Sequence, residues 1–185
     1  MTAEIPAEPD DPIDAALRAG DHRTAVALCA RQHGAALGRL CMSWLGTQSE
    51  ADEAVQETLL AAFDGMGQYR AEGSVRAWLF GIARRVCARR AETRGRREQR
   101  LRLVHGEGDA APGADTLLAA RRDAERVRRA LEQLKPSERD AVVLRYEREL
   151  SFREVGIACG IDEAAARKRV SRALERLRAL LGDGA

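Results

Sequence analysis

Apolar residues recur along most of the chain at intervals of three and four positions, the spacing that places side chains on one face of an α-helix. Strictly alternating apolar and polar runs, which would indicate β-strands, are nearly absent. Ala, Leu, Arg and Glu, which favour helices, dominate the composition, and β-branched residues are sparse. The pattern predicts an all-α protein, with two small helical domains joined by a flexible linker.

Three helices are predicted in the first domain. One spans residues 24–45, and a second begins at Ser49, an N-cap with Asp52 three residues on, and runs to Phe63. After a glycine-rich loop, a third helix begins near Ser74. The apolar positions expected to form the core of this domain are Val26, Cys29, Leu37, Leu40, Cys41, Trp44, Val55, Leu59, Phe63, Val75, Trp78, Leu79, Ile82 and Val86.

The periodic pattern lapses over residues 104–113, which contain three Gly and one Pro and so predict a linker. It returns over residues 115–134, and Pro136 and Ser137 start a further helix. The expected apolar stripe of that helix is Ala141, Val142, Leu144 and Tyr146. The predicted organisation is an acidic leader at 1–22, a domain at 23–103, a linker at 104–114 and a second domain at 115–185.

The segment that begins at Ser151 has the layout of a helix-turn-helix. Ser151 and Glu154 have the spacing of a capping box, in which the serine caps the helix and the glutamate reaches back to the cap amide. Gly160 follows as the residue that can take a positive φ after the helix ends, and Asp162 caps the next helix. A short capped helix, a glycine turn and a longer basic helix are typical of DNA-binding proteins.

The last helix has two distinct faces. Its apolar stripe, expected in the core, is Ala166, Val170, Ala173, Leu174, Leu177 and Leu181. Lys168, Ser171 and Arg172 point away from that stripe, and Arg167 and Arg169 flank it. Any surface helix has a solvated charged face, but the capping box and turn just upstream favour contact with the DNA major groove.

Charge is unevenly distributed, although the net charge is only +2. Ten Arg but only two Glu lie between Arg76 and Arg102, whereas the leader is acidic. A GC-rich genome would also enrich Arg over Lys, so the position of the arginines is more informative than their number. A basic block in a near-neutral chain indicates a surface that binds a polyanion.

Several classes of protein are disfavoured. No apolar run reaches the roughly 18–20 residues of a membrane span, and the acidic N-terminus is unlike a signal peptide. We therefore expect a cytoplasmic protein without membrane insertion. The four cysteines form no CxxC pair, which indicates small buried residues rather than a metal site. No nucleotide-binding, metalloprotease or nucleophile motif occurs, so we expect neither an enzyme nor a cofactor.

Two segments resemble one known family, in the same order along the chain. Residues 130–181, which include the helix-turn-helix, resemble domain four of extracytoplasmic-function sigma factors of the sigma-70 family. Residues 50–90 resemble domain two of the same factors. The resemblance implies a protein that binds bacterial core RNA polymerase, opens the −10 element of a promoter through domain two and reads the −35 element through domain four.

The resemblance also implies a role for individual residues. The acidic segment that docks on the β′ clamp helices of polymerase matches Glu50, Asp52, Glu53, Gln56 and Glu57; without the resemblance these residues are an ordinary solvated face. The loop and helix that capture and hold the opened −10 DNA match Tyr69, Arg70, Glu72, Gly73, Ser74, Arg76, Arg84, Arg85, Arg89 and Arg90, with Arg94, Arg96 and Arg97 extending the basic track. The residues expected at the −35 DNA are Arg167, Lys168, Arg169, Ser171 and Arg172. The polymerase β flap and an anti-sigma factor are further partners that the family implies.

The chain departs from the family pattern in the basic helix. Arg85 and Arg89 stand where the family often has Asn and Asp, which makes this helix more basic. The turn reads CGID where LGIS is more usual, and EAAARKR lacks the common Gly-Thr-Val. A different class of protein, a dimeric transcription regulator that uses the helix-turn-helix alone, is the alternative; it would leave the acidic segment and the basic helix unexplained.

Overall fold

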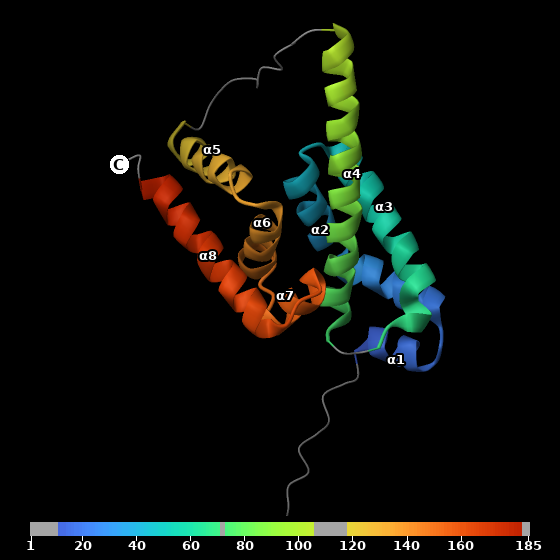
Figure 1. Cartoon of the computed structure of the whole chain (residues 1–185). Coiled ribbons are helices and arrows are strands. Elements are labelled where there is room, and N and C mark those ends of the chain that lie inside the picture. The colour runs from blue at the N-terminus through green and yellow to red at the C-terminus, as the bar shows by residue number, and fades with distance from the viewer. Residues whose placement is uncertain (1–10, 71–72, 106–117, 183–185) are drawn as a thin grey trace, which may run out of the picture. The chain divides into compact units, whose positions relative to one another are not determined.

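The computed structural model describes residues 11–70, 73–105 and 118–182, and within them all side chains outside 97–124. The described residues are helical and contain no strand, and they form two compact units, Met1–Cys87 and Ala88–Ala185 (Figure 1). The predicted all-α class is confirmed, with two helical regions and a helix-turn-helix in the second. Residues 1–10 of the predicted leader and 106–114 of the predicted linker lie outside the described residues.

The first helix, α1 (Pro12–Arg18), was not predicted. Asp11 caps it by accepting a hydrogen bond from the Ile13 amide at 2.9 Å, and Pro12 takes the first helical position. Ile13 and Ala16 are buried, and α1 packs against α2. A helix of seven residues has too few apolar positions to show a helical period. The acidic composition of the segment therefore dominated, and it was predicted as part of the leader.

Helices α2 (His22–Leu45) and α3 (Gln48–Gly65) pack against each other as a hairpin. Asp21 caps α2, and Gly46 ends it at a φ of 84°, which favours glycine. The predicted N-cap of α3 is wrong: the cap is Thr47, whose hydroxyl accepts from the Glu50 amide, and Ser49 lies inside the helix. Thr47 also donates to the Glu50 carboxylate at 3.0 Å, which favours this earlier start.

The α3 residues that face the core differ in part from the prediction. Its buried stripe consists of small residues, Ala51, Ala54, Thr58 and Ala62, whereas Val55 and Leu59 are only partly buried. Phe63 is 45% exposed and Leu60 67% exposed, so Phe63 is not a core residue. Small side chains allow α3 to lie close to α2, and the larger apolar residues are left on the outer face.

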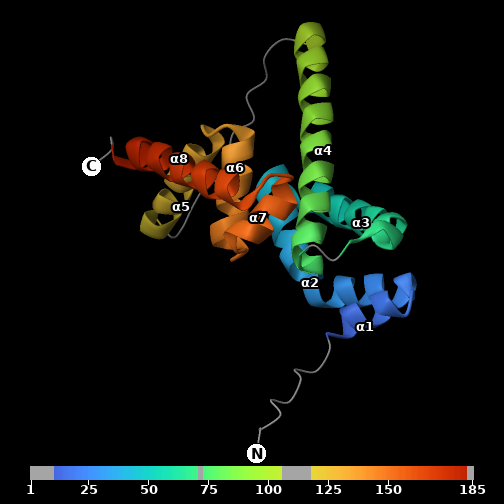
Figure 2. The same cartoon turned by 60° about the horizontal axis from the view of Figure 1, so that its bottom comes forward.

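The basic helix α4 (Val75–His105) follows η1 (Met66–Gln68), and its first half lies beside α2 and α3 (Figure 2). The predicted core positions Val75, Leu79, Ile82 and Val86 are buried, together with Phe80. Trp78 is only partly buried and packs on Tyr69, with ring centroids 5.2 Å apart. Helical backbone continues to His105, beyond the point at which the apolar period lapses.

All four cysteines are free thiols. Cys29, Cys41 and Cys87 are buried, and Cys159 is partly buried. Burial raises the pKa of the Cys29 thiol to about 11, so this side chain stays protonated near neutral pH. Three of the four are therefore small buried residues, as the sequence predicted.

Beyond the C-terminal part of α4, the second unit contains α5 (Leu118–Glu132), α6 (Pro136–Val142), the π-helical turn η2 (Val143–Glu147), α7 (Phe152–Cys159) and α8 (Glu163–Gly182). Its core brings together α5, α6 and α8 through Ala130, Leu134, Val142, Ala173 and Leu177. The carboxylate of Glu138 on α6 is buried and pairs with Arg176 on α8 at 2.8 Å. This ion pair fixes the α6–α8 contact at the edge of the core.

The turn η2 changes the direction of the side chains that follow α6. The Arg148 amide bonds to the Val143 carbonyl, five residues back, at 3.2 Å. Ala141, Val142 and Leu144 are buried as predicted, but Tyr146 is 56% exposed. The prediction for Tyr146 is wrong because it extended the α-helical period through a wider turn.

Glu149, just beyond η2, has a φ of 56°, in the left-handed region that costs a side-chain-bearing residue about 1 kcal/mol. We expect Glu149→Gly to raise the free energy of unfolding of the second unit by about 0.5–1 kcal/mol. Urea unfolding followed by circular dichroism measures this change. Glu149→Ala, which removes the carboxylate but keeps the strain, is the control; an equal gain in that variant would assign the effect to charge rather than backbone.

Candidate nucleic-acid interface

One outer face of α3 combines acids with large apolar side chains. Of the predicted docking residues, Asp52, Glu53 and Gln56 are exposed, and Glu50 and Glu57 are partly buried. At about 100° per residue, Leu60 lies on the same side as Glu53 and Gln56, and Phe63 lies beside Gln56. We call Asp52, Glu53, Gln56, Leu60 and Phe63 the α3 outer face; it offers a charged half and an apolar half.

Tyr69 makes two contacts at the loop before α4. The Tyr69 hydroxyl donates to the Gly73 carbonyl, and its ring packs on Trp78. Burial is the main cause of a raised pKa for Tyr69, which keeps this donor protonated. Ser74 begins α4, its hydroxyl accepting from the Ala77 amide at 3.2 Å. Arg70 is exposed beside the loop, and Glu72 lies outside the described residues.

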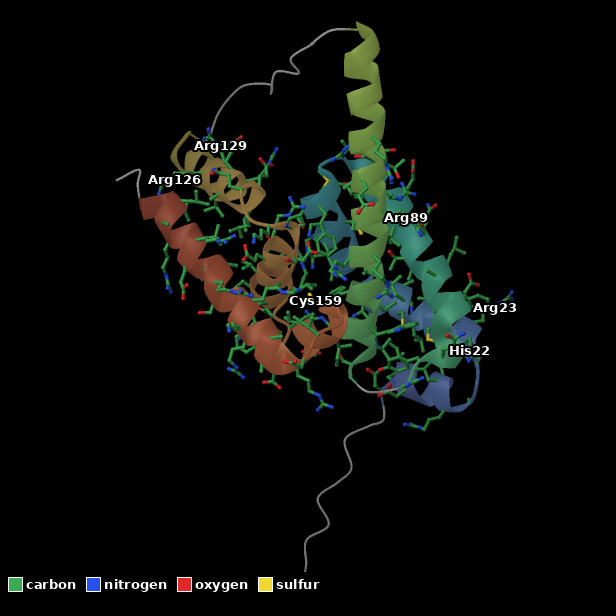
Figure 3. All side chains as sticks on the ribbon, viewed as in Figure 1. His22, Arg23, Arg89, Arg126, Arg129 and Cys159 are labelled. Carbon is green, nitrogen blue, oxygen red and sulfur yellow. The ribbon has the colours of Figure 1, made fainter. Side chains whose placement is uncertain are left out.

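The arginines of α4 form a basic track. Arg85 and Arg89, one helical turn apart, are exposed, and Arg84 and Arg90 are partly buried. Figure 3 shows Arg89 on α4. Partial burial and then the charge of Arg84 lower the pKa of Arg85. These residues therefore present adjacent positive charges that an anion would stabilise.

Arg76, at the start of α4, is held against the protein rather than extended. It is partly buried, with its guanidinium 5.5 Å from the centre of the Phe80 ring. Burial and then the charge of Arg76 lower the pKa of His33, so His33 is neutral near pH 7. The structure thus sets Arg76 apart from the more exposed arginines of the track.

The helix-turn-helix has the predicted caps. Ser151 and Glu154 form a complete capping box, and Gly160 ends α7 at a φ of 68°. The Asp162 carboxylate accepts from the Ala165 amide at 2.7 Å and caps α8. A Cβ atom on Gly156 would lie 2.7 Å from the Ile161 carbonyl oxygen, so the turn requires glycine at this position.

The predicted DNA-contacting residues of α8 are on its outer face. Lys168, Ser171 and Arg172 are exposed, and Arg169 is partly buried. Arg167 is exposed but engaged: it pairs with Glu163 at 2.9 Å, and its guanidinium lies 4.5 Å from the centre of the Phe152 ring. The buried face is Ala166, Val170, Ala173 and Leu177, with Leu174 and Leu181 partly buried, as predicted.

Some residues at these surfaces were not predicted. Leu60 belongs to the α3 outer face, where only its spacing from Glu53 could have indicated it. Arg145 lies 4.9 Å from the centre of the same Phe152 ring that Arg167 approaches, and this contact depends on the η2 turn. No local sequence signal indicates a contact between residues of three different elements.

The described part of the chain contains no helix with the length and apolar character that a membrane span requires. It also holds no group of three or more His, Cys, Asp or Glu side chains arranged to bind a metal ion.

Comparison with known families gives two matches that together cover most of the chain. Sigma-70 region 2 matches residues 29–97, and sigma-70 region 4 matches residues 124–177. RNA polymerase sigma factor CnrH of Cupriavidus metallidurans is 30% identical over an alignment of 184 positions that covers 94% of this chain and 95% of that protein. ECF RNA polymerase sigma factor SigM of Mycobacterium tuberculosis is 31% identical over 153 residues, 82% of this chain and 74% of that protein.

Solved structures show the same fold. CnrH in complex with the cytosolic domain of CnrY matches with a TM-score of 0.66 at 24% identity, covering 94% of this chain and 97% of that one. The sigma factor RpoE in complex with the anti-sigma factor NepR from Bartonella quintana matches with a TM-score of 0.61 at 26% identity, covering 89% and 99%. The chain belongs to the extracytoplasmic-function sigma factors of the sigma-70 family, non-enzymatic proteins that direct RNA polymerase to initiate transcription.

Proposed function

We propose that three surfaces divide the work of this sigma factor. The α3 outer face docks on the β′ clamp helices of core polymerase, the Tyr69 loop and α4 hold the opened −10 element, and α8 reads the −35 element. The observation that carries this proposal is the separation of charge within the first unit, where acids lie on α3 and Arg76, Arg84 and Arg85 lie on the part of α4 that belongs to this unit. Opposite charges on two helices of one unit suit a protein partner on one side and DNA on the other.

Docking through α3 is supported by the mixture of side chains on its outer face. Asp52 and Glu53 can pair with basic groups of polymerase and steer association. Leu60 and Phe63 supply apolar area that would be buried on binding, and aromatic residues are frequent among the strongest contributors to protein interfaces. Partly buried Glu50 and Glu57 flank this face and support its acidic character.

Promoter opening is supported by the loop and by the arginines of α4. An extruded base costs a few kcal/mol of lost stacking, which a binding pocket must offset. The Tyr69–Gly73 hydrogen bond joins the two ends of the loop, and Arg85 and Arg89 offer exposed charges for the phosphates of the parted strands. Arg76, Arg84 and Arg90 are less exposed and contribute positive potential near the same helix.

Reading of the −35 element is supported by the caps and exposures of the helix-turn-helix. Lys168, Ser171 and Arg172 are exposed on the second helix of this motif, the one that enters the major groove. Arg167 and Arg169 lie at the edges of that face, where phosphates pass. Contact of this second unit with the polymerase β flap is part of the proposal by resemblance to the family.

We further infer that an anti-sigma factor holds this protein inactive in the cytoplasm. Two proteins with the same fold, CnrH and RpoE of Bartonella quintana, were solved with the cytosolic domain of CnrY and with the anti-sigma factor NepR. The exposed Leu60 and Phe63 of α3 would be covered in such a complex, as in the complex with polymerase.

The basic track of α4 can be tested by its salt dependence. We consider polymerase reconstituted with the double variant of this protein, Arg85→Ala with Arg89→Ala. Its affinity for a fork-junction promoter with an exposed −10 non-template strand should fall about tenfold. The slope of log K against log salt should decrease by about 1.4, since each phosphate contact with a single strand contributes about 0.7. Fluorescence anisotropy over a series of KCl concentrations measures both quantities.

A matched control removes the same charge elsewhere. Arg126 and Arg129 are exposed on α5 (Figure 3), so Arg126→Ala with Arg129→Ala should leave the slope unchanged. An unchanged slope in the Arg85/Arg89 variant, with normal binding by the wild type, would remove these two residues from the −10 interface.

A further inference from the structure

The outer face of α8 carries one acid among its basic residues. At about 100° per residue, Glu175 lies on the same side of the helix as Lys168 and Arg172, with Ser171 at the edge of this face. The face lies opposite the buried stripe that contains Val170, and all four of its residues are exposed. Lys168 and Glu175 are about 10.5 Å apart along the helix axis, which is roughly the length of three base pairs.

The charge of Glu175 is not balanced within the protein. It makes no ion pair with any basic side chain that the structure describes, although Arg172 and Arg178 lie three positions away on either side. Glu163 and Glu138, by contrast, each pair with an arginine of α8. An unpaired acid on a basic face is repelled by DNA phosphates and lowers general affinity for DNA. A favourable contact with the bases would offset this repulsion.

Ser171 and Glu175 together offer hydrogen-bond acceptors. The Ser171 hydroxyl donates to the Glu175 carboxylate, with Oγ and Oε1 3.4 Å apart. Because the hydroxyl proton is directed at the carboxylate, the lone pairs of Ser171 Oγ remain for a group outside the protein. The carboxylate itself has only acceptor atoms. We call Ser171 and Glu175 the acceptor pair; Lys168 and Arg172 beside it have only donors.

The chemistry of the acceptor pair indicates which base it can contact. In the major groove, cytosine presents one hydrogen-bonding group, its N4 amine, which is a donor. Adenine presents its N6 amine beside the N7 acceptor, and the hydrogen-bonding groups of guanine and thymine are all acceptors. A carboxylate is therefore attracted to cytosine and repelled by N7, O6 or O4 of the other bases. The donors of Lys168 and Arg172 have the opposite preference and suit guanine.

We propose that Glu175, together with Ser171, selects one cytosine of the −35 element through its N4 amine. The acceptor pair discriminates against the other three bases at that position, and the donors of Lys168 and Arg172 contact neighbouring guanines. This inference rests on the proposed role of α8 at the −35 element. It adds Glu175 to that interface and identifies a base that the element contains.

The test uses core polymerase reconstituted with the full chain and a library of promoter duplexes with a randomised −35 region. Sequencing of bound and unbound duplexes gives the relative affinity for each base pair at each position. For the wild type we expect one position at which a G·C pair, in one orientation, is preferred about five- to tenfold. Glu175→Ala should reduce this preference to less than about twofold. Binding to the library as a whole should not weaken, because a charge that repels phosphates is lost.

A conservative variant and a modified base test the contact itself. Glu175→Gln should move the preference at this position towards adenine, because an amide can donate to N7 while it accepts from N6. Replacing the selected cytosine with 2-pyrimidinone, which lacks the N4 amine, should weaken binding of the wild type about five- to tenfold. The same replacement should weaken binding of Glu175→Ala much less, and the difference between the two proteins removes any effect on the duplex itself.

Two further variants separate base selection from general effects of charge. Glu132 is an exposed acid on α5, so Glu132→Ala removes the same charge elsewhere in the second unit and should leave the cytosine preference unchanged. Arg172→Ala should reduce the preference for guanine at a different position. Thermal melting of each variant should stay near that of the wild type, because these side chains are exposed.

The contrary results distinguish this inference from the proposal on which it rests. An unchanged cytosine preference in Glu175→Ala, or an equal loss with 2-pyrimidinone in both proteins, would overturn the role of Glu175 while the role of α8 stands. If Arg172→Ala also leaves every base preference unchanged, the role of α8 at the −35 element is wrong, and this inference fails with it.

Discussion

Replacing Glu53 and Gln56 with lysine should weaken binding to core RNA polymerase at least about 100-fold, a loss of about 2.8 kcal/mol. Both residues are exposed on the α3 outer face, one helical turn apart. Two new positive charges would meet the basic partner surface that the acids are proposed to contact, and like charges at an interface cost several kcal/mol. Titration of fluorescently labelled protein with core polymerase measures the affinity.

The matched control for this prediction lies at the end of α5. Glu132 and Gln133 are likewise an exposed acid and an exposed amide, so Glu132→Lys with Gln133→Lys makes the same change of charge in the other unit. That variant should bind polymerase within about twofold of the wild type. If both variants bind equally well, the α3 outer face is not the docking surface; if both lose binding equally, the effect is one of net charge.

Gly156→Val should destabilise the second unit by at least about 2 kcal/mol, the range expected for overpacking. A Cβ at this position would lie 2.7 Å from the Ile161 carbonyl oxygen and 3.3 Å from the Asp162 carbonyl carbon, both backbone atoms of the turn. The turn would have to open, which moves α8 relative to α7. Denaturation followed by circular dichroism measures the loss, and binding to −35 DNA should fall with it.

A smaller substitution at Gly156 and a valine at a remote glycine test whether the clash with the turn causes this effect. Gly156→Ala should cost less, because alanine gains about 1 kcal/mol of helix propensity that offsets part of the clash. Gly95, in α4, has no atom within 4 Å of an added Cβ, so Gly95→Val should not destabilise the protein. Equal stability of Gly156→Val and the wild type would show that the turn does not depend on this close approach.

The sequence predicted the features that depend on neighbouring residues. The capping box of Ser151 and Glu154, the left-handed Gly160 and the Asp162 cap each involve groups within three residues of one another, and all three are present. The buried and exposed faces of α8 also follow the helical period closely. For the same reason the fold class was predictable from the pattern alone.

Other features depend on packing that no local pattern specifies. Both Thr47 and Ser49 are residue types that can cap α3, so the sequence does not distinguish them. Phe63 was predicted in the core because large apolar side chains are usually buried. The close contact between α2 and α3 selects Ala51, Ala54 and Ala62 instead. The meeting of Arg145, Phe152 and Arg167 requires the π-helical turn, which has no sequence signature.

Run-off transcription with purified core RNA polymerase is the most direct test of the account, using promoter DNA from upstream of the gene that encodes this chain. A discrete transcript that requires the protein, and that is lost with Glu53→Lys and Gln56→Lys but retained with Glu132→Lys and Gln133→Lys, is the expected result. Specific binding of the protein to that DNA as a dimer, without stable binding to core polymerase, would contradict the account and favour a stand-alone regulator.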